Sequence, residues 1–182
     1  MKEMKVKVKF KDNEAKELYL KASDNKSIFP FKTHDNDFCF DCVATSCEEI
    51  APNVYKYGLG IALQIDRSCK EVLVGKLSSN DYGTSIIGVQ PIYENLSIDA
   101  RPRSSVWKTG MSLSNCLGTI DEGFNAEISA VFYHIMPNMP KYEVGDKVIQ
   151  IKLGRTIPME FVEAAELDET SRNGGAYGST GK

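Results

Sequence analysis

The stretch Lys5-Val-Lys-Val-Lys-Phe10 shows the pattern that decides the fold. Its apolar residues alternate with lysines, and because successive side chains of a strand point to opposite faces, this predicts a strand with one buried face. Turn signals such as Pro52-Asn53 and Gly145-Asp146 separate further runs of this kind. Many short strands and one short candidate helix (residues 13–20) predict an all-β, jelly-roll-like sandwich or barrel. The further candidate strands are residues 38–44, 55–65, 72–74, 86–89, 97–100, 127–135, 147–153 and 159–162.

The composition sets limits on function. The chain has 182 residues, 42% of them hydrophobic and 26% charged, which suits one globular domain with a sizeable core. Its net charge of −3, with acids and bases intermixed, argues against binding a nucleic-acid polymer. No apolar run has the length of a membrane span, and the N-terminus lacks the apolar core of a secretory signal. The five cysteines are an odd number, so we expect reduced thiols and a cytoplasmic protein.

The composition changes at Glu166, where a glycine-rich segment begins that has almost nothing to bury. Such a segment cannot offset its ordering entropy alone, so we expect residues 166–182 to form a flexible C-terminal arm. A frayed terminus is the simplest interpretation. One arginine, Arg172, and one aromatic residue, Tyr177, within the glycines favour instead an arm that closes over a ligand. We therefore expect a β domain over 1–165, with an inserted hairpin-like segment at about 66–95, followed by the arm.

Two internal segments suggest chemistry, although each has a plain alternative. Arg101-Pro-Arg-Ser-Ser105 offers a guanidinium and two hydroxyls that suit phosphate oxygens, but such turns are common on surfaces. The stretch 113–127 reads as a hairpin-like excursion that carries Asp121-Glu-Gly, which is either a tight turn or a carboxylate placed to activate water beside Phe124. The end of the arm, Ser179-Thr-Gly-Lys182, does not fit a P-loop, because the first glycine would fall on Ala176 and no helix could follow.

Taken in order along the chain, these segments resemble the five motifs of the trimeric dUTPase family. Asp35-Asn-Asp-Phe-Cys-Phe40 is similar to the first motif and Arg101-Pro-Arg-Ser-Ser105 to the second. Ser114-Asn-Cys-Leu-Gly-Thr-Ile-Asp-Glu-Gly-Phe124 resembles the third, 145–150 the fourth, and 167–181 the fifth. The match covers most of the chain in the family's order.

The resemblance implies a jelly-roll-like homotrimer that hydrolyses dUTP to dUMP and pyrophosphate, with active sites shared between subunits. That reaction limits uracil incorporation into DNA and supplies dUMP for dTMP synthesis. Asp121 would be the general base, and Mg²⁺ would be held mainly by the substrate phosphates, with Asp37 reaching it only through water. The implied substrate-binding residues are Arg103, Ser104, Ser105 and Gln150 for the phosphates, Asn115, Gly118, Thr119, Ile120 and Ser129 for uracil, Phe124 for the deoxyribose, and Arg172, Tyr177, Gly178, Ser179 and Thr180 in the arm.

The chain departs from the family pattern at a few positions. Phe124 stands where tyrosine is common, Ser105 replaces a glycine of the second motif, Ala176 replaces one of the fifth, and Asn125-Ala126 replaces a typical Arg-Gly pair. These changes affect fine geometry more than the reaction. Cys39-Phe-Asp-Cys42 does not predict a zinc site, because residues three apart on a strand face opposite sides.

Two other functions stay open. A dCTP deaminase-like enzyme shares the fold and acts on a similar nucleotide, but the full third and fifth motifs favour dUTP hydrolysis. A regulatory or nucleotide-binding protein on a dUTPase scaffold would use the 66–95 insertion to bind a partner. The presence of both Asp121 and a complete arm argues against a purely binding role.

Overall fold

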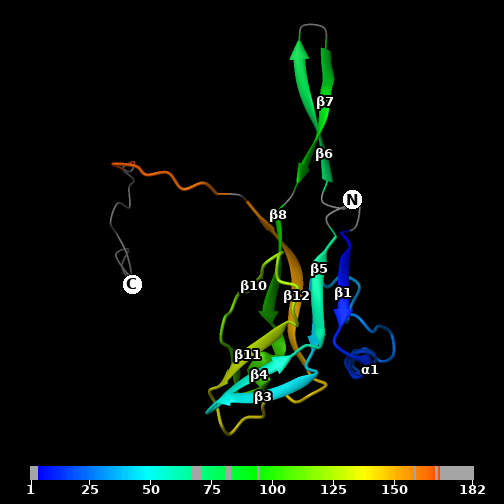
Figure 1. The fold of residues 1–182 in the computed structure, drawn as a ribbon, viewed down its shortest axis with the longest axis vertical. Helices are drawn as coiled ribbons and strands as arrows, with labels where there is room; N and C mark the ends of the chain where they lie inside the picture. The colour runs from blue at the N-terminus through cyan, green and yellow to red at the C-terminus, as the bar shows by residue number, and fades with distance from the viewer. Residues whose placement is uncertain are drawn as a thin grey trace.

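The computed structural model describes residues 4–66, 71–80, 83–93, 95–157, 159–166 and 168; for 71–80, 83–93 and 95 it describes the backbone alone. The described chain is dominated by antiparallel strands with one α-helix and one 3₁₀ turn (Figure 1). The elements are β1 Val6–Phe10, α1 Asn13–Ala22, β2 Phe40–Val43, β3 Ser46–Ala51, β4 Val54–Gly58, β5 Ile61–Ile65, β6 Glu71–Asn80, β7 Gly83–Tyr93, β8 Asn95–Pro102, η2 Ser104–Lys108, β9 Met111–Leu113, β10 Gly118–Ile120, β11 Ser129–His134 and β12 Lys147–Thr156.

Two four-stranded sheets form the body, one in the order β10-β8-β12-β2 and the other in the order β3-β4-β11-β9. A single core joins them, because Cys42, Val148 and Ile149 of the first sheet belong to the same buried cluster as Tyr57 and Phe132 of the second. The pair β1-β5 adds Leu63 and Ile65 to that cluster, and Val6 and Val8 pack against it. The predicted all-β sandwich is therefore confirmed.

The predicted alternation of β1 and the predicted short helix are both confirmed. In β1 the apolar residues are half-buried and the lysines at 7 and 9 are exposed. Helix α1 begins after Asp12, whose carboxylate accepts a hydrogen bond from the backbone N–H of Ala15 at 2.8 Å. Its Tyr19 side chain is fully buried, which ties the helix to the core. No helix in the described part of the chain is long and apolar enough to cross a membrane.

The expectation of one strand over residues 55–65 is wrong, since the chain turns there and forms β4 and β5 in different sheets. Gly60 has φ +64°, a left-handed conformation that glycine adopts without strain. A Cβ atom at this position would lie 2.6 Å from the Cβ of Ala15 and 2.8 Å from the side chain of Thr45. Close packing and backbone geometry therefore both favour glycine at the corner between the two sheets.

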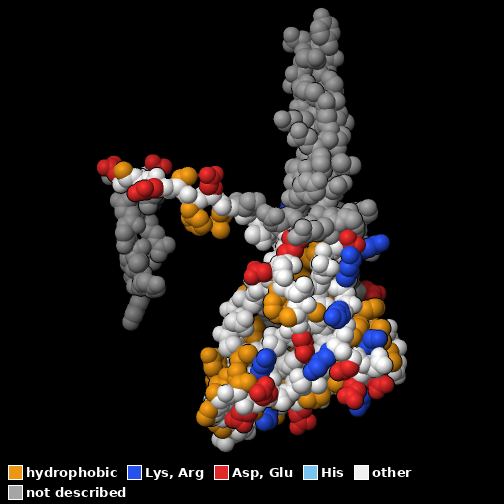
Figure 2. Space-filling model, in the orientation of Figure 1, with side chains coloured by type: hydrophobic (Ala, Val, Ile, Leu, Met, Phe, Trp, Pro, Cys, Tyr) orange, Lys and Arg blue, Asp and Glu red, His pale blue; other side chains and the backbone are white. Residues whose placement is uncertain are grey.

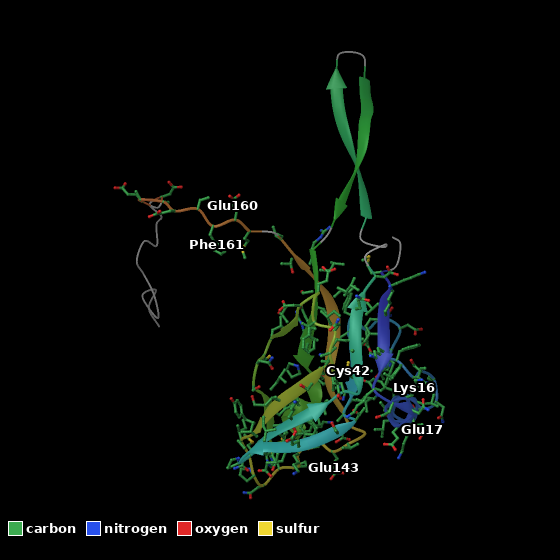
Figure 3. All side chains as sticks on the ribbon, in the orientation of Figure 1. Lys16, Glu17, Cys42, Glu143, Glu160 and Phe161 are labelled. Atoms are coloured by element: carbon green, nitrogen blue, oxygen red, sulfur yellow. The ribbon has the colours of Figure 1, made fainter. Side chains whose placement is uncertain are left out.

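The strand expected at residues 159–162 is also absent. β12 keeps its neighbour β8 only as far as the pair Thr156↔Asn95, where β8 begins, so the following residues have no strand to join. The described residues 159–166 instead leave the body as an extended segment, on which Figure 3 labels Glu160 and Phe161. Figure 2 shows acidic and apolar atoms along it, and Phe161 is 91% exposed.

Strands β6 and β7 lie in the region expected as an insertion. They pair antiparallel with each other from Glu71↔Tyr93 to Asn80↔Gly83 and form a two-stranded sheet of their own. In Figure 1 this ribbon projects from the body, beyond the ends of β5 and β8.

Candidate active site

Arg103 and Asp41 form the centre of a polar cluster at one end of the first sheet. The Arg103 guanidinium donates to both carboxylate oxygens of Asp41, from Nε to Oδ1 at 2.8 Å and from Nη2 to Oδ2 at 3.3 Å. Its Nη1 donates to Ser105 Oγ at 3.2 Å, and Lys147 Nζ lies 3.8 Å from Asp41 Oδ2. With Gln150, which pairs in register with Asp41, these residues are called the arginine–aspartate cluster below.

The backbone explains why the cluster forms. Asp41 lies on β2 and Gln150 on the neighbouring β12, so both side chains belong to the same level of the sheet. β8 ends at Pro102, and Arg103 follows in extended conformation as the residue that precedes the 3₁₀ turn η2. The Gln150 amide donates to the Pro102 carbonyl at 3.1 Å, which fixes the point where the chain leaves the sheet. The predicted residues Arg103, Ser105 and Gln150 are thus brought together, and Ser104 starts the turn beside them with its side chain exposed.

Asp41 is a site residue that the sequence alone did not reveal. It is 7% exposed, and its Oδ2 also accepts a hydrogen bond from the Thr33 hydroxyl at 3.3 Å. Asp37, the acid expected to reach a metal ion through water, lies in the loop before β2, where its carboxylate accepts a hydrogen bond from the backbone N–H of His34 at 2.9 Å. A carboxylate inside the apolar run Phe40-Asp41-Cys42-Val43 was the available signal, because a buried acid needs a partner.

The stretch expected as a hairpin-like excursion, residues 113–127, does not form a paired hairpin, so that expectation is wrong. β9 pairs with β11 in the second sheet, whereas β10 pairs with β8 in the first. Residues 111–124, called the crossing segment below, comprise β9, β10, the residues between them and the turn after β10. They carry the chain from the second sheet to the first. Within this segment, Asn115 lies close to Gly118: a Cβ atom added at Gly118 would be 3.2 Å from Asn115 Nδ2.

The other predicted residues of this region differ in exposure: Gly118 is buried and Ile120 half-buried, whereas Thr119, Asp121, Phe124 and Ser129 are exposed. Gly118, Thr119 and Ile120 form β10, which lies at the edge of its sheet. Asp121 is exposed and opens a turn closed by the hydrogen bond from the Phe124 N–H to the Asp121 carbonyl at 3.0 Å. The Phe124 side chain is 45% exposed, and Ser129 begins β11 with its side chain exposed.

The two groups of residues are far apart within one chain. Ile120, next to Asp121, pairs with Ile98 in the middle of β8, while Arg103 lies just beyond the C-terminal end of the same strand. At about 3.3 Å per residue, the path along β8 from Ile98 to Arg103 spans roughly 16 Å. The residues predicted in the arm, Arg172, Tyr177, Gly178, Ser179 and Thr180, lie outside the described residues.

The fold is similar to that of solved dUTPase structures. Against the dUTPase of Staphylococcus bacteriophage 80alpha the TM-score is 0.65 over 98% of this chain and 99% of that one, at 14% identity. Against the dUTPase of phage phi11 of S. aureus it is 0.57 over 91% and 99%, at 13% identity. The architecture is therefore that of a dUTPase-like jelly roll.

Sequence similarity gives the same result. The chain is 28% identical to the deoxyuridine 5'-triphosphate nucleotidohydrolase of Clostridium novyi over 168 residues, which are 90% of this chain and 98% of that protein. It is 38% identical to the corresponding protein of Finegoldia magna over 91 residues, or 50% of this chain and 64% of the relative. The alignment with the Nocardia farcinica protein spans 50% of that relative. No family model matches the chain. In sequence and in fold the chain is thus similar to dUTPases.

Proposed function

We propose that the protein hydrolyses dUTP to dUMP and pyrophosphate. The observation that carries this proposal is that Asp41 holds Arg103 in place beside a serine-bearing turn, while an exposed acid, Asp121, follows the edge strand β10. Relatives named deoxyuridine 5'-triphosphate nucleotidohydrolase support it, one of them aligned over 98% of its length.

The arginine–aspartate cluster would hold the phosphates. Asp41 contacts Arg103 through both carboxylate oxygens, so the guanidinium is held in one orientation before substrate arrives. A donor fixed in advance costs no reorganisation when charge develops on a phosphate. Ser104, Ser105 and Gln150 add neutral donors around the same turn.

Asp121 would act as general base. It would accept a proton from the water that attacks the α-phosphorus, so that the bond between that phosphorus and the leaving pyrophosphate breaks. Its exposed position at the end of β10 leaves room for the water and the nucleotide.

Uracil would bind along β10. Among the described strands, β10 has a neighbour on one side only, so the backbone groups on its other edge are free to pair with a ligand. The N–H and C=O groups of Gly118–Ile120 can match the carbonyls and the N3–H of uracil. Cytosine would leave these groups unpaired, which is a strong basis for rejection. Asn115 and Ser129 would complete the pocket, and Phe124 would lie against the deoxyribose.

The separation along β8 favours an active site built by two copies of the chain. The backbone of Arg103 lies roughly 16 Å along β8 from Ile98, which pairs with Ile120 beside Asp121, and that is a long span for one triphosphate. A symmetric assembly would solve this, because the crossing segment of one copy can meet the arginine–aspartate cluster of another. We assign a homotrimer on this argument together with the family resemblance.

Mg²⁺ would be held mainly by the substrate phosphates. The described residues contain no group of three or more His, Cys, Asp or Glu side chains able to hold a metal, and the Asp41 oxygens are engaged by Arg103, Lys147 and Thr33. This donor set fits an ion that arrives with the nucleotide. When bound, the ion would neutralise charge on the phosphates and the leaving pyrophosphate. A mutant of the dUTPase from phage phi11 coordinates a structural Mg(II) ion, which supports magnesium as the metal.

The arm, with Arg172 and Tyr177, would close over the nucleotide, with Arg172 at the γ-phosphate and Tyr177 stacked on uracil. Ordering the arm would exclude water from the site, at an entropic cost that its contacts with the nucleotide must exceed.

A second role beside catalysis has one observation in its favour. The β6–β7 ribbon projects from the body, where a partner can reach it (Figure 1). Phage dUTPases such as that of phage 80alpha control transfer of virulence genes, and the phi11 enzyme has a species-specific insert. Excising the ribbon should leave dUTP turnover intact and abolish partner binding; loss of turnover would contradict a separate role.

A pyrophosphate-release assay across dUTP, dTTP, dCTP and UTP tests the proposed function. We expect turnover of dUTP at least a hundredfold above the other three, because the pocket would reject cytosine by hydrogen-bond mismatch and would reject the thymine methyl and the ribose hydroxyl by steric fit. Ammonia release from dCTP would identify a deaminase instead. Equal turnover of all four, or none, would contradict the proposal.

A further inference from the structure

Residues 121–127, called the Asp121 loop below, lie between β10 and β11 and carry two residues of the proposed site, Asp121 and Phe124. Much of this loop is exposed. A Cβ atom added at Gly123 would meet no described residue within 4 Å other than its chain neighbours, and the Phe124 side chain is 45% exposed. The loop therefore needs a further contact to hold the ring and the carboxylate in place.

Glu127 makes such a contact at the end of the Asp121 loop. Its Oε1 accepts a hydrogen bond at 3.0 Å from the backbone N–H of Gly60, at the corner between β4 and β5. Its Oε2 lies 3.8 Å from Lys11 Nζ. The side chains of this ion pair are 35% exposed for Glu127 and 55% exposed for Lys11, so the pair adds little. The hydrogen bond from Gly60 is therefore the stronger of the two contacts.

The β4–β5 corner leaves room for this carboxylate. A Cβ atom added at Gly58 would lie 2.7 Å from Glu127 Oε1, so the glycine lets the carboxylate approach the backbone. The same corner holds the next residue, Ile128. Its N–H donates to the Ile61 carbonyl at 2.9 Å, and its carbonyl accepts from the Leu59 N–H at 3.0 Å. The backbone of Ile128 thus fixes where the chain enters β11, and the Glu127 side chain fixes the residue before it.

Two hollows reach the Glu127 side chain. One of about 270 Å³ is lined also by residues of β1 and β5, and the other, of about 170 Å³, by residues of β3 and β4. A loop released from the corner would therefore have room to move. Gly60 is buried, and its N–H would lose an acceptor at a cost in free energy if the Glu127 side chain were removed.

We infer that Glu127 is a positioning residue that determines the selection of deoxyribose over ribose. By accepting the hydrogen bond from Gly60, it holds the Asp121 loop so that the Phe124 ring fills the space that a ribose 2′-hydroxyl would need. The same contact holds Asp121 in place. The inference rests on the proposed function for the roles of Phe124 and Asp121. Loss of the contact should therefore lower sugar discrimination as well as turnover.

Calorimetric titration of the full chain with dUMP, and separately with UMP, tests the inference without requiring turnover. Glu127→Ala should lower the ratio of the two affinities by about tenfold, because a displaced ring no longer excludes the 2′-hydroxyl. Glu127→Gln keeps a side-chain oxygen that accepts from Gly60 and should keep the ratio. The matched control Lys11→Gln removes the ion pair and leaves the hydrogen bond, so it should keep the ratio too.

The ratio of affinities also separates positioning from a merely structural role. Partial unfolding lowers the number of binding sites and reduces both affinities alike, so it leaves their ratio unchanged. An unchanged ratio in Glu127→Ala, a ratio lost equally in Glu127→Gln, or no preference for dUMP in the unaltered protein would overturn the inference.

Steady-state kinetics of dUTP hydrolysis on the same proteins test the proposed function separately. Glu127→Ala should lower kcat by up to about a hundredfold, because a small displacement of Asp121 spoils its alignment with the attacking water. Glu127→Gln should restore most of that loss. A sugar preference that depends on Glu127, in a protein that does not hydrolyse dUTP, would contradict the proposed function alone.

Discussion

The arginine–aspartate cluster follows the C-terminal end of β8, whereas the crossing segment pairs alongside the middle of that strand, and the two regions are built in opposite ways. The cluster is closed: Asp41 is 7% exposed, and its oxygens contact Arg103, Lys147 and Thr33. The crossing segment is open, with Asp121 exposed and Phe124 at 45%. This difference is what the proposed function requires: a first region preorganised for a fixed charge and a second that leaves room for a base, a sugar and a water molecule.

This contrast predicts that the two regions respond differently to mutation. Changes in the crossing segment should remove activity at little cost in stability. Changes in the cluster should reduce both, because its charges are partly buried and depend on each other.

The largest effect is expected for Asp121→Asn. Turnover of dUTP should fall by about 10²–10⁴-fold, the usual contribution of a general base, while nucleotide binding persists. The free energy of unfolding should change by less than about 0.5 kcal/mol, since the side chain is exposed. Steady-state kinetics and urea denaturation measure the two quantities, and a fully active variant would mean that another group is the base.

Asp41→Ala should have the next largest effect, mainly on stability. It leaves Arg103 and Lys147 without their carboxylate, with side chains 27% and 25% exposed. We expect the free energy of unfolding to fall by about 2–4 kcal/mol, somewhat below the value for a fully buried pair. Urea denaturation at one fixed protein concentration measures it.

The double variant Asp41→Asn/Arg103→Gln is the control for that change, because it removes both charges together. It should be less destabilised than Asp41→Ala. Equal stability of Asp41→Ala and the unaltered protein would show that the cluster does not hold charge in the way described.

The last prediction is a difference in the chemical reactivity of two cysteines, one in each region. Cys42 follows Asp41 and is fully buried (labelled in Figure 3), and burial raises its pKa. Cys116 lies exposed in the crossing segment. Because the thiolate is the reactive form, a maleimide should label Cys116 at least a hundredfold faster than Cys42 at neutral pH.

Mass spectrometry of peptides from the labelled protein reads both rates. Exposed Cys47 is the control for general accessibility. Comparable labelling of Cys42 and Cys116 would show that the cluster opens as readily as the crossing segment.

The sequence predicted the regular strands better than the corners. Alternation located β1, β2, β8, β11 and β12 because each has an apolar face that meets the core. It missed β3, all six residues of which are exposed, so no alternation marks it. The corner at Gly60 could not be predicted from local pattern, because it depends on contacts with Ala15 and Thr45.

Some residues of the candidate site could likewise be predicted from the sequence, whereas others required the structure. Arg103, Ser105 and Gln150 were found from their order along the chain, and the structure brings them together. Of the acids near β2, the sequence could not show which one meets Arg103, since that contact joins residues 62 apart in the chain. The separation of Asp121 from Arg103 could not be predicted from the sequence either, because it follows from the register in which β10 pairs with β8.

The central claim is that one active site combines the crossing segment of one chain with the arginine–aspartate cluster of another. Mixing two inactive variants tests it most directly: Asp121→Asn and the double variant Asp41→Asn/Arg103→Gln, unfolded together and refolded at equal amounts, beside each variant refolded alone. If the two regions come from different chains of a symmetric assembly, about one quarter of the sites carry both intact regions, and dUTP turnover should recover to about that fraction. Turnover that stays at the level of the separate variants, in a mixture shown by mass to contain both chains, would contradict the shared site.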